Sequence, residues 1–291
     1  MADLVVFGDS VPWGQGLLPQ DKFAHQIAAA LRLRLRMRAH SGARIVTDED
    51  AAQTAPPEVP HPNPSVMQQI VRYRGDTAKA RVVLINGGVN DLKVSNVLSP
   101  LTSPESLRRK IGQTCYHDMK AALQAALEKF TDPATRVVLI GYYPFFSAES
   151  TFSQITCYLT SWFISLPTAA RNPLLERIIS NSQLFWTEST AMFRQAVADL
   201  ASPRLRLAEL PFAARNAMFA PEPWLFNVYW VGDSVYAEDA LAAERREDAD
   251  RFHDSEIDRH LAYIASAGHP NLRGSKMHAE TILRLLSDWP A

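Results

Sequence analysis

Four short blocks of small and polar residues could together perform acyl transfer in this 291-residue chain. Gly8-Asp9-Ser10 follows an apolar run near the start of the chain, and His40-Ser41-Gly42 comes next. Gly87-Gly88-Val89-Asn90-Asp91 follows a second apolar run, and Gly268-His269-Pro270-Asn271 lies near the end. Such residues in loops supply a nucleophile, a base and hydrogen-bond donors.

Each block has a candidate role in that chemistry. Serine is a poor nucleophile until a base removes its proton, and histidine suits this task near neutral pH. We therefore expect Ser10 to attack and His269 to act as the base. The N–H groups of Ser10 and Gly42 and the amide of Asn90 are candidate donors to the oxyanion, each worth roughly 3 kcal/mol in other enzymes.

Taken singly, the same residues have simpler interpretations. A serine at a strand-to-helix turn is most often a helix cap, and Asn90-Asp91 alone is typical of a turn. Asp9 and Asp91 are expected to bind loop N–H groups, and Asn271 to form a turn. The occurrence of all four blocks in one chain favours a catalytic site or its relic.

The elements that must position these blocks are short apolar strands alternating with helices. This alternation predicts a parallel sheet with helices on both faces, and ligands bind such sheets beyond the carboxyl ends of the strands. The predicted buried strands are 4–7, 82–85 and 136–140. The predicted helices are 22–31, a helix from Ser65, 103–130 with Ser103 as N-cap, 173–200 and 275–286.

Residues 31–38 alternate leucine or methionine with arginine, which is typical of a strand with one wet face. The arginines are either a patch that binds anions or the solvated face of an edge strand. We favour the edge strand, because basic residues protect exposed sheet edges.

In order and spacing the four blocks resemble the SGNH hydrolases, also called GDSL esterases or lipases. The flanking Trp13-Gly14-Gln15-Gly16 is also similar to the family's first block. The resemblance covers about 1–145 and 262–291. It implies an α/β fold, a three-layer α/β/α sandwich with a central parallel sheet of flavodoxin-like type.

By the same resemblance Ser10 is the nucleophile, His269 the general base, and Gly42 and Asn90 donate to the oxyanion. Residues 1–291 would form one hydrolase domain with a largely helical insertion or lid at about 146–261, which would set the substrate. Gly232-Asp233-Ser234 repeats the first motif inside this insertion, and without the other blocks we interpret it as a coincidence.

One position departs from the family pattern. The family usually places an aspartate three residues before the histidine, and this chain has Ser266 there. Asp254 or Asp258 could replace the missing acid. Alternatively, a Ser–His dyad could suffice, with Ser266 or a backbone carbonyl holding the imidazole, or the site could be impaired. Loss of the aspartate from a full triad costs about four orders of magnitude elsewhere.

The segment 142–166 is rich in large apolar side chains, among them Phe145 and Phe146. It is either plain core packing or the wall of a pocket for an apolar acyl group. Residues 238–260 are strongly charged and are expected to be helical and exposed.

Composition narrows the class of protein. A net charge of −1 argues against a nucleic-acid partner, and 47% hydrophobic residues indicate a globular core. Two cysteines exclude a disulfide scaffold and a four-cysteine metal site. No apolar run is long enough for a membrane span, and the N-terminus lacks a signal-peptide pattern. We therefore expect a cytoplasmic protein without a membrane segment.

The sequence thus predicts a carboxylic ester hydrolase that needs no cofactor or metal and acts on a small-molecule or lipid-like ester. Two alternatives remain open. The same acyl-enzyme could pass its acyl group to another acceptor, as in an acyltransferase. A catalytically weak protein that binds acyl groups or carbohydrates would keep the scaffold alone. The residues make no prediction of oligomeric state.

Overall fold

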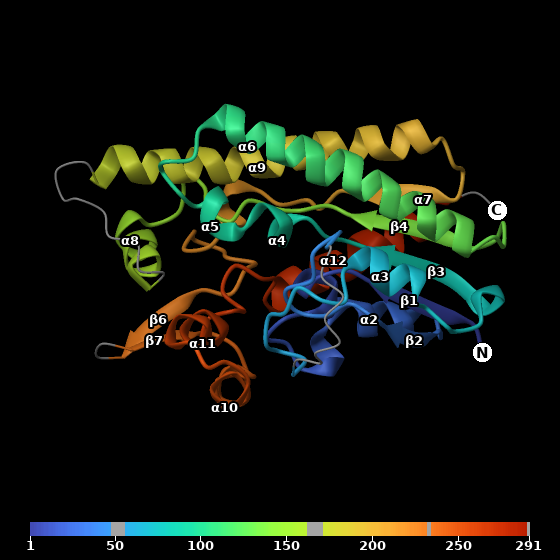
Figure 1. The fold of residues 1–291 in the computed structure, drawn as a ribbon, viewed down its shortest axis with the longest axis horizontal. Coiled ribbons are helices and arrows are strands. Elements are labelled where there is room, and N and C mark those ends of the chain that lie inside the picture. The colour runs from blue at the N-terminus through green and yellow to red at the C-terminus, as the bar shows by residue number, and fades with distance from the viewer. Residues whose placement is uncertain (48–55, 162–170, 232–233, 290–291) are drawn as a thin grey trace.

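The computed structural model describes residues 1–47, 56–161, 171–231 and 234–289. Its centre is a five-stranded parallel sheet with strand order β2-β1-β3-β4-β5 (Figure 1). The strands are β1 (Asp3–Phe7), β2 (Arg34–Met37), β3 (Ala80–Ile85), β4 (Arg136–Ile140) and β5 (Leu205–Ala208). The three predicted buried strands are confirmed as β1, β3 and β4.

The central strands are apolar on both faces because helices cover both sides of the sheet. Val6 pairs with Leu84, and Leu84 pairs with Val138, and all three side chains are fully buried. Near-continuous runs of Val, Leu and Ile are expected in strands of a parallel sheet whose two faces are both covered by helices.

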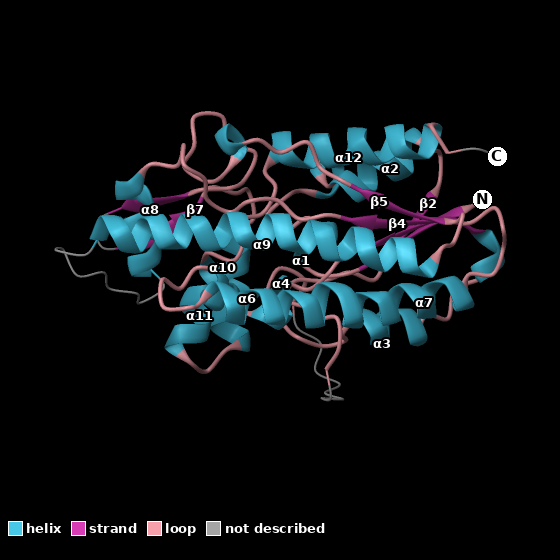
Figure 2. Cartoon of the chain, turned by 90° about the horizontal axis from the view of Figure 1, so that it is seen from above, coloured by secondary structure: helices cyan, strands magenta, loops and turns pink. Residues whose placement is uncertain are grey.

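The helices form two layers around the sheet (Figure 2). On one side lie α2 (Phe23–Ala30) and α12 (Leu272–Ser287), and on the other α3 (Val66–Val71), α6 (Pro104–Ile111) and α7 (Met119–Lys129). A π-helical segment, Gly112–Asp118, joins α6 to α7. The predicted three-layer α/β/α sandwich with a central parallel sheet is confirmed.

Local signals fix several helix starts. Ser103 accepts a hydrogen bond from the N–H of Ser106, and Pro104 takes the first helical position, as the sequence predicts. Ser65 and Gln68 form a capping box at the start of α3.

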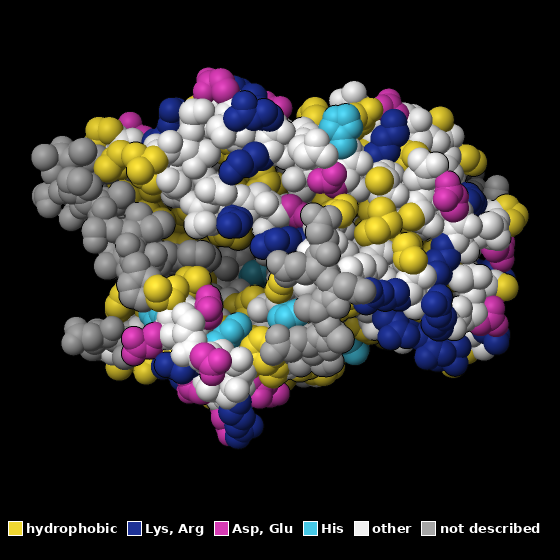
Figure 3. All heavy atoms as spheres, viewed as in Figure 1, with side chains coloured by type: hydrophobic (Ala, Val, Ile, Leu, Met, Phe, Trp, Pro, Cys, Tyr) yellow, Lys and Arg dark blue, Asp and Glu magenta, His cyan; other side chains and the backbone are white. Residues whose placement is uncertain are grey.

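Strand β2 lies at the edge of the sheet, as the alternating arginines predict. Arg34 and Arg36 pair with the buried carboxylate of Asp3, at 2.8 and 3.4 Å. Figure 3 shows basic side chains gathered over this part of the molecule.

The range 146–261 is not an insertion throughout. Strand β5 pairs with β4, and α9 (Arg171–Leu200) packs along α6 and α7, so both belong to the sandwich. The remaining elements lie beyond the carboxyl edge of the sheet (Figure 1). They are α8 (Phe152–Ser161), the hairpin β6 (Val228–Val231) and β7 (Ser234–Ala237), α10 (Ala242–Phe252) and α11 (Glu256–Tyr263).

Trp162 and Phe163 of the aromatic segment and Gly232 and Asp233 of the second Gly-Asp-Ser lie outside the described residues. Across the described ranges, no helix combines the length and apolar character needed to cross a membrane.

Candidate active site

Ser10 and His269 meet at the carboxyl edge of the sheet although 259 positions separate them. Ser10 begins α1 (Ser10–Trp13), directly after β1, and Asp9 caps this helix by accepting from the N–H of Val11 at 2.9 Å. His269 precedes α12, which Asn271 caps by accepting from two backbone N–H groups. The Nε2 atom of His269 lies 2.7 Å from the Oγ atom of Ser10.

The hydrogen bonds of His269 indicate its tautomer. Its Nδ1 lies 3.3 Å from the carbonyl oxygen of Ser266, which can only accept a hydrogen bond. Nδ1 therefore carries the hydrogen, and the lone pair of Nε2 faces the Ser10 hydroxyl. Desolvation lowers the pKa of His269 to about 4, so the ring is neutral near pH 7. The geometry is that of a serine and a base ready to accept its proton.

Asn90 and Gly42 line the same cavity as Ser10. Asn90 belongs to α4 (Val89–Leu92), and its amide donates one N–H to the carbonyl of Ala43 at 2.9 Å. That bond orients the amide and leaves its second N–H for a ligand. The Ser10 N–H lies in the first turn of α1, where backbone N–H groups have no intrahelical partner.

Backbone conformation and close packing both require a glycine at position 42. Its φ is +82°, and a Cβ atom there would lie 2.3 Å from the backbone nitrogen of His61. The close approach that the glycine permits is thus to the chain at residues 60–61.

A short hydrogen-bond chain joins the Ser10 and Asn90 blocks. The N–H of Val89 donates to the hydroxyl of Tyr142 at 3.0 Å, which donates to Asp9 at 2.9 Å. Asp91 accepts from the N–H of Ile45 at 3.0 Å. Asp91 therefore binds a loop N–H group, as the sequence predicts, whereas Asp9 binds an N–H group in the first turn of α1. Burial raises the pKa of each carboxyl group to about 6.

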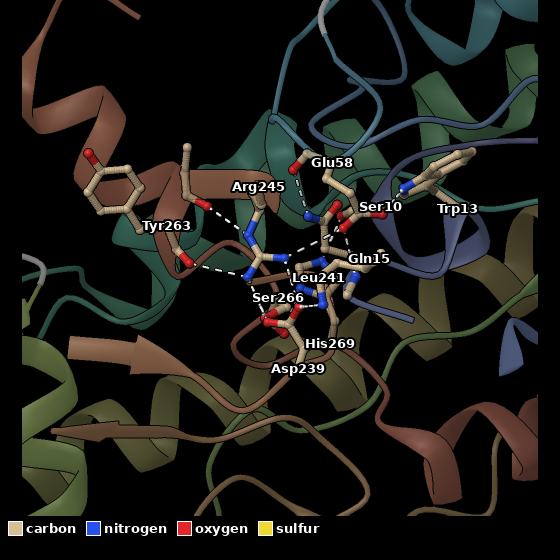
Figure 4. Close-up of polar contacts among 12 residues, drawn as sticks. Ser10, Trp13, Gln15, Glu58, Asp239, Leu241, Arg245, Tyr263, Ser266 and His269 are labelled. Atoms are coloured by element: carbon tan, nitrogen blue, oxygen red, sulfur yellow. Dashed lines mark hydrogen bonds and ion pairs between the residues drawn. The ribbon is translucent and has the colours of Figure 1, made fainter. Parts of the chain in front are cut away.

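A group of charged side chains lies behind His269 (Figure 4). Arg245 is fully buried and forms two hydrogen bonds with Asp239, at 2.6 and 3.1 Å. Ser266 donates its hydroxyl to Asp239 at 2.5 Å. Glu58 lies 3.5 Å from Arg245 and accepts from the N–H of Gly16 at 2.9 Å. We call Glu58, Asp239 and Arg245 the anchor cluster.

The anchor cluster corrects two expectations. The segment 238–260 is not exposed throughout, because Arg245 and the side chain of Asp239 are completely buried. Asp254 and Asp258 are exposed, and the structure does not bring either to His269, whose Nδ1 contacts a backbone carbonyl. Asp239 had no signal in the sequence, since it reaches Ser266 across 27 positions of a segment rich in charge.

The cavity in front of Ser10 has a volume of about 270 Å³. Figure 3 shows this face hollowed between the surfaces of the α4 region and of α10–α11. The apolar wall includes Val89, Tyr142, Tyr143, Phe145, Tyr158 and Ile264. Lys93 also lines it, and no carboxylate does so among the described residues.

The aromatic segment contributes both to the core and to the cavity wall. Phe145 faces the cavity, whereas Phe146 is fully buried and packs against Tyr158 and Phe219 with ring centroids 5.9 and 6.1 Å apart. No group of three His, Cys, Asp or Glu that could hold a metal ion occurs within the described part of the chain.

No protein-family model matches this sequence, and no curated protein matches it. Solved structures do resemble it. A carbohydrate esterase family 2 enzyme with a carbohydrate-binding domain, from Corynascus thermopiles (Myceliophthora fergusii), has 15% identity and a TM-score of 0.50. That alignment covers 98% of this chain, which spans 65% of the esterase chain.

A lipase from a goat rumen metagenome has 14% identity and a TM-score of 0.48, with coverage of 99% and 98% of the two chains. A salicylyl-acyltransferase from a tetracycline biosynthetic pathway has 13% identity and a TM-score of 0.44, with coverage of 98% and 54%. At such identities the likeness is one of fold. The chain shares its α/β fold with the carbohydrate esterase, and an α/β fold is what its four sequence blocks predict.

Proposed function

We propose that this protein is a serine hydrolase that cleaves a carboxylic ester through an acyl-enzyme on Ser10. The observation that carries the proposal is the 2.7 Å contact between Ser10 Oγ and His269 Nε2 at the floor of an apolar cavity. Gly42 and Asn90 on the same cavity wall support it, because acyl transfer also needs donors for an oxyanion.

In this mechanism His269 accepts the proton of Ser10 as the oxygen attacks the ester carbonyl. The N–H groups of Ser10 and Gly42 and the free N–H of Asn90 bind the oxyanion. The tetrahedral intermediate then expels the alcohol, which takes the proton from His269. Water attacks the acyl-enzyme in the same way and releases the acid.

The cavity wall favours an apolar acyl group. Most of its lining is aromatic or aliphatic, and a volume of about 270 Å³ suits a short or medium chain or a single ring. An acyltransferase would use the same acyl-enzyme with another acceptor in place of water, so the proposal covers hydrolysis first and acyl transfer as its variant.

A fluorophosphonate tests this function without knowledge of the substrate. We expect intact-mass analysis to show one adduct on the wild type and none on Ser10→Ala or His269→Ala, with all three folded by circular dichroism. A folded wild type without an adduct would refute the proposal and favour a protein that binds acyl groups or carbohydrates without turnover.

A further inference from the structure

The geometry points to Ser266, Asp239 and Arg245 as positioning residues that hold the imidazole of His269 in its working tautomer. This inference rests on the proposed function, since it concerns the same base. In this inference the backbone carbonyl of Ser266 takes the position of the aspartate. The hydroxyl of Ser266 and the Asp239–Arg245 ion pair hold that carbonyl in place.

The first step is the double use of Ser266. Its carbonyl oxygen accepts from His269 Nδ1 at 3.3 Å, and its hydroxyl donates to Asp239 at 2.5 Å. The hydroxyl also accepts from Arg245 at 3.3 Å. Because the side chain is bonded on both sides and is fully buried, the direction of the carbonyl of the same residue is fixed as well.

The second step is the hold of Arg245 on the approach to this residue. Its guanidinium donates to the carbonyls of Ala262 at 3.0 Å and Tyr263 at 3.2 Å. These carbonyls lie at the end of α11, where the chain turns towards His269. A planar guanidinium with several fixed donors is suited to hold such a segment at several points.

The third step connects both halves of the site. Glu58 of the anchor cluster accepts from Trp13 Nε1 at 2.8 Å and from the N–H of Gly16, just after the Ser10 helix. Gly16 packs so closely on Ser266 that a Cβ atom would lie 2.7 Å from the Cβ of the serine. The segments that carry the nucleophile and the base are thus fixed to one buried group.

Ser266, Asp239 and Arg245 act on His269 by fixing the position of its ring and not through their net charge. Asp239 raises the pKa of His269 while Arg245 lowers it, so the carboxylate is offset by its own partner. A carboxylate in direct contact with the imidazole would stabilise the protonated ring. A carbonyl instead selects the tautomer and the ring orientation.

Ser266→Ala removes the hydroxyl and leaves the Asp239–Arg245 pair in place. We expect kcat for a p-nitrophenyl ester and the rate of fluorophosphonate labelling to fall about 10-fold, with KM within about 2-fold. The matched control is Ser275→Ala, which also removes a fully buried hydroxyl, one that donates to the carbonyl of Asp21 at 2.6 Å. A Ser266→Ala enzyme with the kcat of the control would overturn the inference.

Asp239→Asn tests the second link. Both carboxylate oxygens accept from Arg245, so an amide in either orientation sets a donor against the guanidinium. If Asp239 and Ser266 act on His269 through the same contacts, the kcat of the double variant Asp239→Asn/Ser266→Ala will be no lower than that of the slower single variant. Losses that multiply in full would show two separate effects and contradict a shared anchor.

The ring of His269 gives a readout that does not depend on turnover. Long-range ¹H–¹⁵N NMR spectra should show a hydrogen on Nδ1 in the wild type and a mixture of tautomers in Ser266→Ala. An unchanged tautomer in the variant would refute the positioning role. If the wild type shows the Nδ1–H tautomer but takes no fluorophosphonate, the proposed function fails while the anchor stands.

Discussion

Phe145 and Phe146 are neighbours in the chain but belong to different parts of the molecule. Phe145 lines the cavity and stacks on Phe185 with centroids 5.8 Å apart, whereas Phe146 is fully buried away from the cavity. The chain bends at these two residues, after the end of β4. Sequence composition marked the segment as aromatic but gave no means of separating wall from core.

Phe145→Ala is therefore expected to change acyl preference, and Phe146→Ala to change stability. Widening the cavity should shift the ratio of kcat/KM for octanoyl over acetyl p-nitrophenyl esters by roughly 10-fold. Phe146→Ala should lower the free energy of unfolding by about 3–5 kcal/mol with little change in that ratio. Equal loss on all esters and a large fall in Tm for Phe145→Ala would instead assign Phe145 to the core.

At the scale of elements, the loops after β1 and β3 are positioned by the strands that precede them. Ser10 and Asn90 were predictable because parallel strands bring their carboxyl ends to one edge.

Strand β5 was missed because Leu205–Ala208 is only four residues long and holds one arginine. The hairpin β6–β7 was missed because its first strand begins at the end of a stretch rich in proline and aromatic residues, 211–230. The roles of Asp239 and Arg245 were not predictable, since only the folded chain brings these residues to Ser266.

Gly42→Ala tests how tightly the loop after β2 is held. The positive φ costs about 1–2 kcal/mol for any residue with a Cβ atom, and contact with the backbone at His61 adds to this. We expect a lower Tm and a loss of activity as the loop moves from the cavity.

Gly112→Ala is the matched control for this prediction. Its φ is −59°, and a Cβ atom there would meet nothing within 4 Å, so alanine should stabilise the helix by about 0.5–1 kcal/mol. Equal Tm values for the two variants in thermal unfolding would contradict the strain assigned to Gly42.

At the scale of the whole molecule, buried titratable groups make stability depend on pH. Burial lowers the pKa of His278 to about 4, and its ring stacks on Phe23 with centroids 5.0 Å apart. This histidine lies on the buried face of α12. A depressed histidine pKa stabilises the fold above the unfolded value of 6.5, and this contribution is lost as the pH falls towards 4.

His278→Leu should remove this part of the pH dependence. From pH 7 to pH 5 the wild type should lose about 2 kcal/mol more stability than the variant, since one pKa unit corresponds to about 1.4 kcal/mol. Asp9 and Asp91, whose raised pKa values act in the opposite direction, are present in both proteins and cancel in the difference. The measurement is urea unfolding of both proteins at pH 7 and pH 5. If the free energy of unfolding fell by the same amount in the wild type and in His278→Leu, the assignment to His278 would be contradicted.

The contact between the Ser266 carbonyl and His269 bears on how serine–histidine sites are identified from sequence motifs. A motif that demands a carboxylate three residues before the histidine rejects this chain, although a neutral imidazole still lies 2.7 Å from the serine. In this chain the contacts around His269 come from three separate segments, which carry Ser266, the pair of Asp239 and Arg245, and Glu58. A serine in the position of that aspartate is therefore a reason to inspect the segments packed around the histidine before a chain is set aside as inactive.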